Sequence, residues 1–203
     1  MKVITVGVID YGMGNQASVI HALRGLGFRV RISAQIQELE QTEILILPGV
    51  GAFPAAMQKL HQLDLVDYLQ EKARKHEPII GICLGMQLFA SLSHEYGLTA
   101  GLDLIPGEVL PSPEAKWHIG WNTFECVSED PLFQPSDGQT FYFNHSFYFQ
   151  GPREYHIAVS RHVQPFVSAI RRNKVVGVQF HPEKSQSAGR ELLKNIILGL
   201  IDA

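Results

Sequence analysis

A strand pattern changes to a helix pattern around one cysteine in Ile79-Ile80-Gly81-Ile82-Cys83-Leu84-Gly85-Met86-Gln87-Leu88-Phe89. This stretch starts as an apolar run that is too short for a helix, and it continues after Cys83 with helix-forming residues up to Leu92. We therefore expect a buried strand that turns sharply at Cys83 into a helix. Gly81 and Gly85 suit such a turn, because they relieve crowding where the backbone is strained and where the helix packs on its strand.

A cysteine at this turn is a candidate nucleophile. A helix that begins beside the thiol favours the thiolate through its free N–H groups and its positive dipole end. The backbone N–H of Leu84 is also placed to donate to an oxyanion formed on a carbonyl under attack. We expect the Cys83 side chain to be partly exposed at the edge of a sheet. The alternative is an inert buried cysteine, since free cysteines are among the most buried residues.

Length and composition describe an ordinary globular chain. Its 203 residues, 45% hydrophobic and 18% charged, predict one domain over residues 1–203 with a sizeable core. A net charge of −3 without long basic runs argues against binding of nucleic acid or of an anionic membrane. Two cysteines and no apolar run of membrane-spanning length favour the reducing cytoplasm.

The first half of the chain alternates between strand and helix patterns. Apolar β runs are followed by helical spacing, and Asp64 marks a break in the longest helical stretch. This alternation predicts a largely parallel sheet, covered by helices, with ligands at the carboxyl ends of its strands. A dinucleotide site is not expected, because Gly12-x-Gly14 lacks the third glycine of that motif. The expected strands are 3–9, 28–33, 43–47 and 79–83, and the expected helices are 18–26 and 55–75.

The second half of the chain has a different sequence pattern, with few helix signals before its end. Glycine and proline punctuate short strand-like pieces, which predicts an antiparallel or mixed strand region before a last amphipathic helix. The fold class is therefore α/β, with a mostly parallel central sheet and an additional antiparallel or mixed part. The expected strands are 120–127, 140–144, 156–163, 166–170 and 175–180, and the last helix is 187–200.

A cysteine nucleophile needs a base and a group that orients the base. His181 follows an apolar strand and precedes Pro182, so its ring is expected at a strand end. In an extended backbone Glu183 would lie on the same side as His181, and we expect it to fix the tautomer of the ring. A structural histidine is the alternative, since such pairs are often incidental. His118 and His145 stand in aromatic loops that suit either substrate capture or simple core packing.

These motifs resemble the class I glutamine amidotransferases, and among them the glutaminase subunits of imidazole glycerol phosphate synthase. The resemblance spans nearly the whole chain, and it implies the fold of that family. Its pieces are Asp10-Tyr11-Gly12-Met13-Gly14-Asn15, Leu47-Pro48-Gly49-Val50-Gly51-Ala52-Phe53, Gly81-Ile82-Cys83-Leu84-Gly85-Met86-Gln87, His118-Ile119-Gly120-Trp121-Asn122, Tyr142-Phe143 with His145-Ser146, and Gly177-Val178-Gln179-Phe180-His181-Pro182-Glu183-Lys184-Ser185.

The resemblance implies a Cys-His-Glu triad that hydrolyses glutamine to glutamate and ammonia. No metal is expected, because no two His or acidic residues show helical ligand spacing with a third ligand in support, and no cofactor is expected. Cys83 attacks the side-chain amide, His181 relays protons, and Glu183 orients His181. A thioester forms, and water hydrolyses it. The residues expected to stabilise the oxyanions through their backbone are Val50 and Leu84, and those expected to hold the glutamine are Gly51, Gln87, His145, Ser146 and Phe147.

The resemblance also implies a partner, a (β/α)₈-barrel cyclase that forms a heterodimer with this chain. Ammonia passes into the barrel, which makes imidazole glycerol phosphate and an aminoimidazole ribotide (AICAR) in histidine biosynthesis. The residues expected at the partner face are Asn15, Trp121, Tyr142 and Lys184.

Three departures from the family pattern lie near that face: Gln16-Ala17, Lys116-Trp117 and Asn144. They leave open a paralogous glutaminase that supplies ammonia for amidination of a bacterial surface sugar. A stand-alone cysteine hydrolase and a non-catalytic binding subunit fit the motifs less well. Cys126 has no assigned role.

Overall fold

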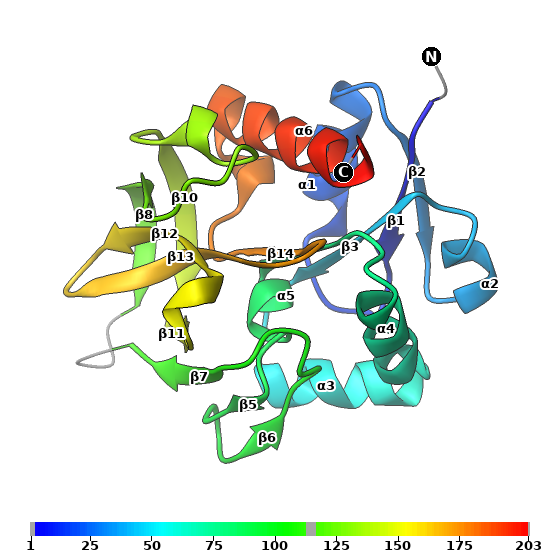
Figure 1. Cartoon of the computed structure of the whole chain (residues 1–203). Coiled ribbons are helices and arrows are strands. Elements are labelled where there is room, and N and C mark those ends of the chain that lie inside the picture. Colours follow the sequence, from blue (N-terminus) through cyan, green and yellow to red (C-terminus); the bar gives the residue numbers. More distant parts are fainter. Residues whose placement is uncertain (1–2, 113–116, 203) are drawn as a thin grey trace.

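The computed structural model describes residues 3–112 and 117–202. Within these residues the largest sheet has eight strands in the order β2-β1-β3-β4-β14-β13-β12-β9 (Figure 1). Its strands are β1 (Thr5–Ile9), β2 (Arg29–Ser33), β3 (Ile44–Gly49), β4 (Ile79–Cys83), β9 (Glu125–Cys126), β12 (His156–Arg161), β13 (Pro165–Arg172) and β14 (Val175–Val178). Of the departures from the family pattern, Lys116 lies outside the described residues.

The pairing divides this sheet into two parts. The strands from β2 through β1, β3 and β4 to β14 pair in parallel, whereas β13, β12 and β9 continue in antiparallel fashion. This division confirms the predicted α/β class with its mostly parallel sheet and antiparallel addition. One consequence matters for the site: β14, from the end of the chain, lies directly beside β4, with Val178 opposite Ile82.

Helices cover both faces of the sheet. In Figure 1, α1 (Gln16–Gly25) and α6 (Gln186–Asp202) lie on one side, and α3 (Phe53–Gln62) and α4 (Leu65–Arg74) lie on the other. Each face of the sheet packs into its own hydrophobic core, and successive strand residues point to the two faces in turn. Ile46 therefore belongs to the core beneath α1 and α6, and Leu47 belongs to the core beneath α3 and α4. The predicted break at Asp64 is confirmed, because this residue takes a left-handed conformation with φ 56° between α3 and α4. The short helix α2 (Ile36–Leu39) was not predicted.

The helix after Cys83 is much shorter than expected. Only α5 (Leu84–Gln87) is α-helical, whereas the sequence predicted a helix up to Leu92. The carbonyls of Leu88 and Phe89 accept hydrogen bonds from the backbone of the 102–105 segment, at 2.8 to 3.0 Å, in place of helical donors. The dipole of so short a helix contributes less to a thiolate than the sequence suggested.

The second half builds two smaller sheets beside the large one. One sheet pairs β10 (Thr140–His145) with β8 (His118–Thr123), and the other has the order β11-β7-β5-β6. The predicted strand 120–127 is therefore divided between β8 and β9 in different sheets. His118 and His145 lie on strands rather than in loops, opposite each other in register. The strands of the other small sheet, which were not predicted, are β5 (Leu92–Ser93), β6 (Thr99–Ala100), β7 (Glu108–Pro111) and β11 (Phe147–Gln150).

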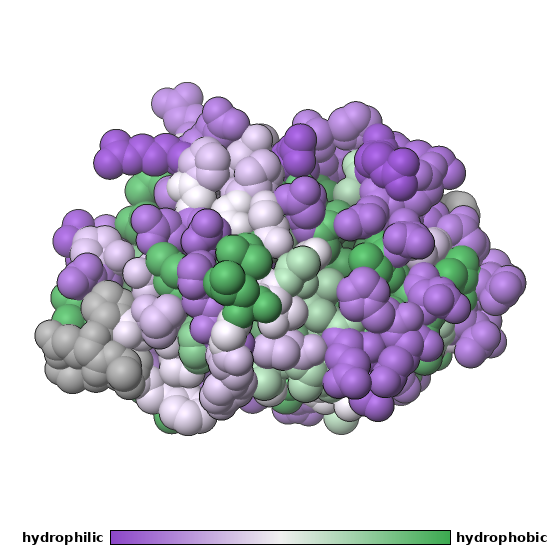
Figure 2. Space-filling model, turned by 90° about the horizontal axis from the view of Figure 1, so that it is seen from below, coloured by the Kyte–Doolittle hydropathy of each residue, from purple (hydrophilic) through white to green (hydrophobic). Residues whose placement is uncertain are grey.

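The surface is mixed in character. On the face seen from below in Figure 2, hydrophobic residues appear in small groups among hydrophilic ones. Within the described part of the chain, no helix is long and apolar enough to cross a membrane.

Candidate active site

The turn at Cys83 is strained, as the sequence predicted. Cys83 has φ 54° and ψ −111°, a backbone conformation that L-residues rarely adopt and that is often found at functional sites. Its two neighbouring glycines permit close packing around it. A Cβ at Gly81 would lie 2.6 Å from the Gly85 carbonyl oxygen, and one at Gly85 would lie 1.8 Å from the Leu47 carbonyl oxygen.

The thiol of Cys83 is buried, with 5% exposure, so the expectation of a partly exposed side chain was wrong. It is enclosed because β10 and the end of β14 pack over the turn. The sulfur donates to the carbonyl of Asn144 at 3.7 Å, and it accepts from the side-chain amide of Gln179 at 3.7 Å. The thiol thus has polar neighbours on two sides, unlike an inert cysteine in an apolar core.

His181 and Glu183 come to Cys83 because β14 lies beside β4. Nδ1 of His181 is 2.8 Å from Oε1 of Glu183, and their side chains are 2% and 1% exposed. Burial lowers the pKa of His181, but the nearby Cys83 sulfur and the Glu183 carboxylate outweigh it, so the pKa is raised. The interaction with Glu183 places the remaining reactive nitrogen, Nε2, on the other side of the ring.

Two buried polar atoms of this group lack partners. Among the described residues, Nε2 of His181 and Oε2 of Glu183 make no hydrogen bond. Buried atoms of this kind are rare in folded proteins, and a catalytic role is one explanation for them. The group therefore combines a thiol, an imidazole with a free nitrogen, and a carboxylate that orients the ring, which is the chemistry needed for nucleophilic attack on a carbonyl.

A cavity of about 390 Å³ opens above the thiol. Its walls contain every residue that the sequence predicted for oxyanion or glutamine binding: Val50, Gly51, Leu84, Gln87, His145, Ser146 and Phe147. Gln87 Nε2 donates to the Phe147 carbonyl at 2.9 Å. The cavity is large enough for a small polar substrate whose reacting group points to Cys83.

Several residues of this site were not predicted from the sequence, and Gln179 and Glu95 are the most polar of them. Gln179 is fully buried, and its Oε1 accepts from Gln87 Nε2 at 3.0 Å while its nitrogen reaches Cys83. A glutamine inside an apolar strand pattern was a usable signal. Glu95 lines the cavity, is 7% exposed, and accepts from the Phe53 N–H at 2.7 Å. Burial raises the pKa of Glu95, and no local pattern around it in the sequence pointed to the site.

Three of the four residues expected at a partner face lie together. The Trp121 and Tyr142 rings are 6.1 Å apart, and the Lys184 ammonium lies 5.8 Å from the centre of the Tyr142 ring. The backbone joins this cluster to the site, since the His181 N–H donates to the Tyr142 carbonyl at 2.9 Å. The fourth residue, Asn15, precedes α1, and its side chain donates to Ser18 Oγ at 2.9 Å.

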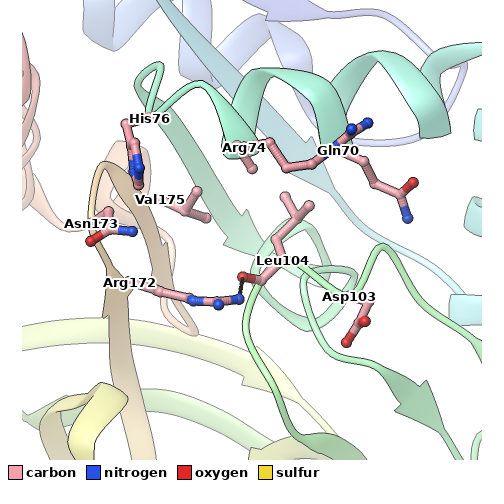
Figure 3. Close-up of a pocket in the computed structure, with 9 residues that line it drawn as sticks. Gln70, Arg74, His76, Asp103, Leu104, Arg172, Asn173 and Val175 are labelled. Atoms are coloured by element: carbon pink, nitrogen blue, oxygen red, sulfur yellow. Dashed lines mark hydrogen bonds between the residues drawn. The ribbon is translucent and has the colours of Figure 1, made fainter.

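A second cavity of about 410 Å³ lies elsewhere on the molecule, between α4 and the β13–β14 turn (Figure 3). Its cationic groups are already paired. Arg172 donates to the Leu104 carbonyl at 3.1 Å, and Arg74 pairs with Glu71 at 2.8 Å and extends toward Gln70. The guanidinium groups do not converge on one point, so this cavity is a weak candidate for a ligand site.

Comparison with known proteins identifies the family of this chain. The model of the family "Glutamine amidotransferase class-I" matches residues 7–200, and the chain belongs to this family. Its relatives include the protein named imidazole glycerol phosphate synthase subunit HisH of Carboxydothermus hydrogenoformans. This chain is 42% identical to the Carboxydothermus protein, over 93% of this chain and 96% of the relative. The HisH protein of Moorella thermoacetica is 45% identical over 94% of this chain and 92% of the relative.

Solved structures show the same fold at low sequence identity. A putative GMP synthase subunit from Thermoplasma acidophilum superposes with a TM-score of 0.75 at 21% identity. The superposition covers 100% of this chain and 96% of that one. PurLQS from Thermotoga maritima gives a TM-score of 0.76 at 18% identity, covering 98% of this chain and 100% of that one.

Proposed function

We propose that this chain is the glutaminase subunit of an imidazole glycerol phosphate synthase. In this role it hydrolyses glutamine and passes the ammonia to a cyclase barrel in histidine biosynthesis. The observation that carries the proposal is the buried group formed by Cys83, His181 and Glu183 beneath a cavity of substrate size. The similarity to HisH subunits over nearly the whole chain supports the same assignment.

The chemistry follows from the positions of these groups. His181 takes the thiol proton at Nε2, and the Cys83 sulfur attacks the amide carbon of glutamine. The proton on His181 then passes to the departing nitrogen, which leaves as ammonia and generates a thioester. Water, deprotonated by His181, hydrolyses the thioester to glutamate. Glu183 stabilises the imidazolium that forms in both steps.

Two backbone N–H groups would stabilise the oxyanions, those of Leu84 and Val50. Leu84 follows the nucleophile directly, and Val50 lies in the loop after β3, where Gly51 has φ 115°. Each such donor is worth on the order of 3 kcal/mol in comparable sites. Glutamine has an α-ammonium group, and the Glu95 carboxylate in the cavity wall is a suitable partner for it.

We place the partner barrel against the cluster of Trp121, Tyr142 and Lys184, with Asn15 near its edge. An exposed Trp beside a Tyr is typical of protein interfaces, and Trp121 is 49% exposed. The enzyme would work as a heterodimer in the cytoplasm, where the Cys83 thiol stays reduced.

The test is the release of glutamate from glutamine by the purified chain, alone and with the histidine-pathway cyclase and its nucleotide ligand. Strong stimulation by the cyclase is the expected result. No stimulation by a cyclase that is itself active with free ammonia would refute the assignment to this pathway and would revive the surface-sugar alternative, which nothing in the comparisons favours.

A further inference from the structure

A row of buried polar side chains connects strand β8 to the wall of the active-site cavity. His118 lies opposite His145 in the β8–β10 pair, and Nδ1 of His118 is 3.1 Å from Nε2 of His145. Nδ1 of His145 is 2.8 Å from the carbonyl oxygen of Phe147, in the cavity wall. At the other end, the Asn122 side-chain nitrogen is 3.3 Å from Nε2 of His118. The two rings are only 5% and 7% exposed.

The partners of these atoms decide where the hydrogens lie. A carbonyl oxygen only accepts, so Nδ1 of His145 carries the hydrogen that is donated to Phe147. Nε2 of a neutral His145 is then an acceptor, and Nδ1 of His118 must donate to it. Nε2 of His118 is in turn an acceptor, and it receives a hydrogen from Asn122. Both rings are therefore in the Nδ1–H tautomer.

The Asn122 amide cannot be reversed without breaking other contacts. Its Oδ1 accepts from the Thr123 N–H at 2.8 Å, while its nitrogen also donates to the Arg161 carbonyl. An amide turned the other way would place an oxygen against the Arg161 carbonyl and an N–H against the Thr123 N–H. The direction of donation along the whole row is fixed from this end as well.

The environment of the rings favours their neutral forms. Burial lowers the pKa of His118 to about 4 and that of His145 to about 3. His162 stacks on His118 with ring centres 4.4 Å apart, and it lowers both pKa values further. At neutral pH each ring therefore has one donor and one acceptor, as the row requires.

The row continues beyond Phe147 to the nucleophile. The Phe147 carbonyl accepts a second hydrogen bond from Gln87, and Gln87 also donates to Gln179, which donates to the Cys83 sulfur. The Phe147 carbonyl therefore connects the His118–His145 pair to the side chains of Gln87 and Gln179. A shift of its carbonyl would release Gln87, whose side chain lines the cavity.

We propose that the His118–His145 pair is a positioning device for the substrate: it holds the Phe147 carbonyl, and through it the Gln87 side chain, in the orientation that binds glutamine. The pair does not touch the reacting atoms, so it acts on substrate binding and not on the chemistry at Cys83. The proposal rests on the glutaminase function proposed above. If the rings only fill space, any apolar side chain of similar size would serve as well.

The test compares two substitutions of His118. Asn places an amide nitrogen near the position of Nδ1 and so retains the donor to His145, whereas Leu fills similar space without a donor. In the complex with the cyclase, we expect H118L to raise the KM for glutamine about five- to tenfold, with kcat within about twofold of the wild type. H118N should return the KM to within about threefold. An unchanged KM in H118L, or equal damage in both variants, overturns the proposal.

A second readout does not need turnover. The glutamine analogue 6-diazo-5-oxo-L-norleucine and the small reagent iodoacetamide both alkylate an accessible reactive thiol. H118L should need several times more of the analogue for half-maximal labelling of Cys83, while its rate with iodoacetamide is unchanged. An equal fall with both reagents would place the effect on the thiol and contradict a role in substrate binding.

The tautomers can be checked in the wild-type chain, so a variant that fails to fold does not end the test. Nitrogen-15 NMR of the imidazole rings should show both His118 and His145 as Nδ1–H tautomers at neutral pH. An Nε2–H tautomer at either ring overturns the proposal. Failure of the proposed function would look different, since the wild type in the complex would then neither turn over glutamine nor react with the analogue.

Discussion

Nδ1 of His181 lies 2.8 Å from Oε1 of Glu183, and the two side chains are almost completely buried beside the thiol of Cys83. The hydrogen bond assigns the Nδ1 proton and leaves Nε2 for the reaction. It also pairs a buried carboxylate with the charge that His181 acquires when it takes the thiol proton. Glu183 is therefore expected to affect the rate without contacting the substrate.

Glu183→Gln should reduce the glutaminase rate of the complex on the order of 10³-fold or more, by analogy with the loss of the orienting acid in serine hydrolases. The amide retains the size of the carboxylate but permits the wrong tautomer and cannot stabilise an imidazolium. Steady-state glutamate release measures the effect, with the unfolding midpoint in urea as a control for stability. A rate within tenfold of the wild type would contradict the assigned role.

Cys83→Ala should abolish glutamine hydrolysis while the chain still folds and binds the cyclase. Cys83 is 5% exposed, but its sulfur faces the cavity and polar neighbours, so its removal costs little apolar packing. Cys126→Ala is the matched control and should remain active, because burial raises the pKa of Cys126 to about 11 and its thiol donates to the Phe133 carbonyl. Residual turnover by Cys83→Ala would exclude Cys83 as the nucleophile.

Gly85→Ala should destabilise the chain strongly. The new Cβ would lie 1.8 Å from the Leu47 carbonyl oxygen, and neither backbone can move without disturbing β3 or the turn at Cys83. Overpacking of this kind costs about 1–3 kcal/mol and occasionally more. Gly25→Ala is the control, since a Cβ there meets nothing within 4 Å in helix α1 and should be neutral or slightly stabilising. Urea unfolding compares the two, and equal midpoints would refute the packing argument.

The stability of the chain should fall as the pH drops from about 6.5 toward 4, in part because of His118 and His145. Their pKa values in the folded state are lowered to about 4 and about 3, so in this range the unfolded chain binds more protons. Each ring then contributes a slope of up to about 1.4 kcal/mol per pH unit. The raised pKa of His181 acts in another pH range: its contribution to stability is complete below about pH 6.5 and is lost only as the pH rises toward its folded-state pKa of about 10.

The contribution of one ring can be isolated. H118N should lessen the pH slope of the unfolding free energy relative to the wild type, whereas replacement of the exposed His21 by Asn should leave it unchanged. Urea titrations at several pH values between 4 and 7 give the slopes. Identical slopes for all three chains would mean that His118 is not held neutral by burial.

Trp121→Ala should weaken binding of the cyclase by roughly tenfold or more, as expected for an exposed aromatic residue at the centre of an interface. Val127→Ala is the control, because Val127 is similarly exposed, at 54%, but follows β9 in another sheet. Calorimetric titration of each variant with the cyclase measures the affinity. Equal affinities of Trp121→Ala and Val127→Ala for the cyclase would mean that the partner does not bind at β8 and β10.

Much of the fold could be predicted from local patterns. The strand and helix alternation of the first half, the break at Asp64 and the sharp turn at Cys83 were all visible, because each depends on residues close together in the sequence. The length of α5 was not, since the carbonyls of Leu88 and Phe89 bond to a segment that follows more than ten residues later. The division of 120–127 between two sheets likewise depends on distant partners.

In the site, too, features set by local motifs could be predicted, and features set by residues distant in the sequence could not. Cys83, His181 and Glu183 stand in local motifs, and the order of the strands brings them together. Gln179 and Glu95 were not predicted as site residues, since their roles come from what lies opposite them in space; only Gln179, a polar residue in an apolar strand pattern, left a signal in the sequence. The burial of Cys83 was missed for the same reason, because the residues that cover it come from the second half of the chain.

The most direct test of the proposed mechanism is to trap the covalent intermediate. The complex with the cyclase is mixed with radiolabelled glutamine, quenched in acid and digested, and the labelled peptide is identified. We expect the label as a thioester on the peptide that contains Cys83, and none in Cys83→Ala. Absence of label from an active complex, or label on the Cys126 peptide, would contradict the mechanism.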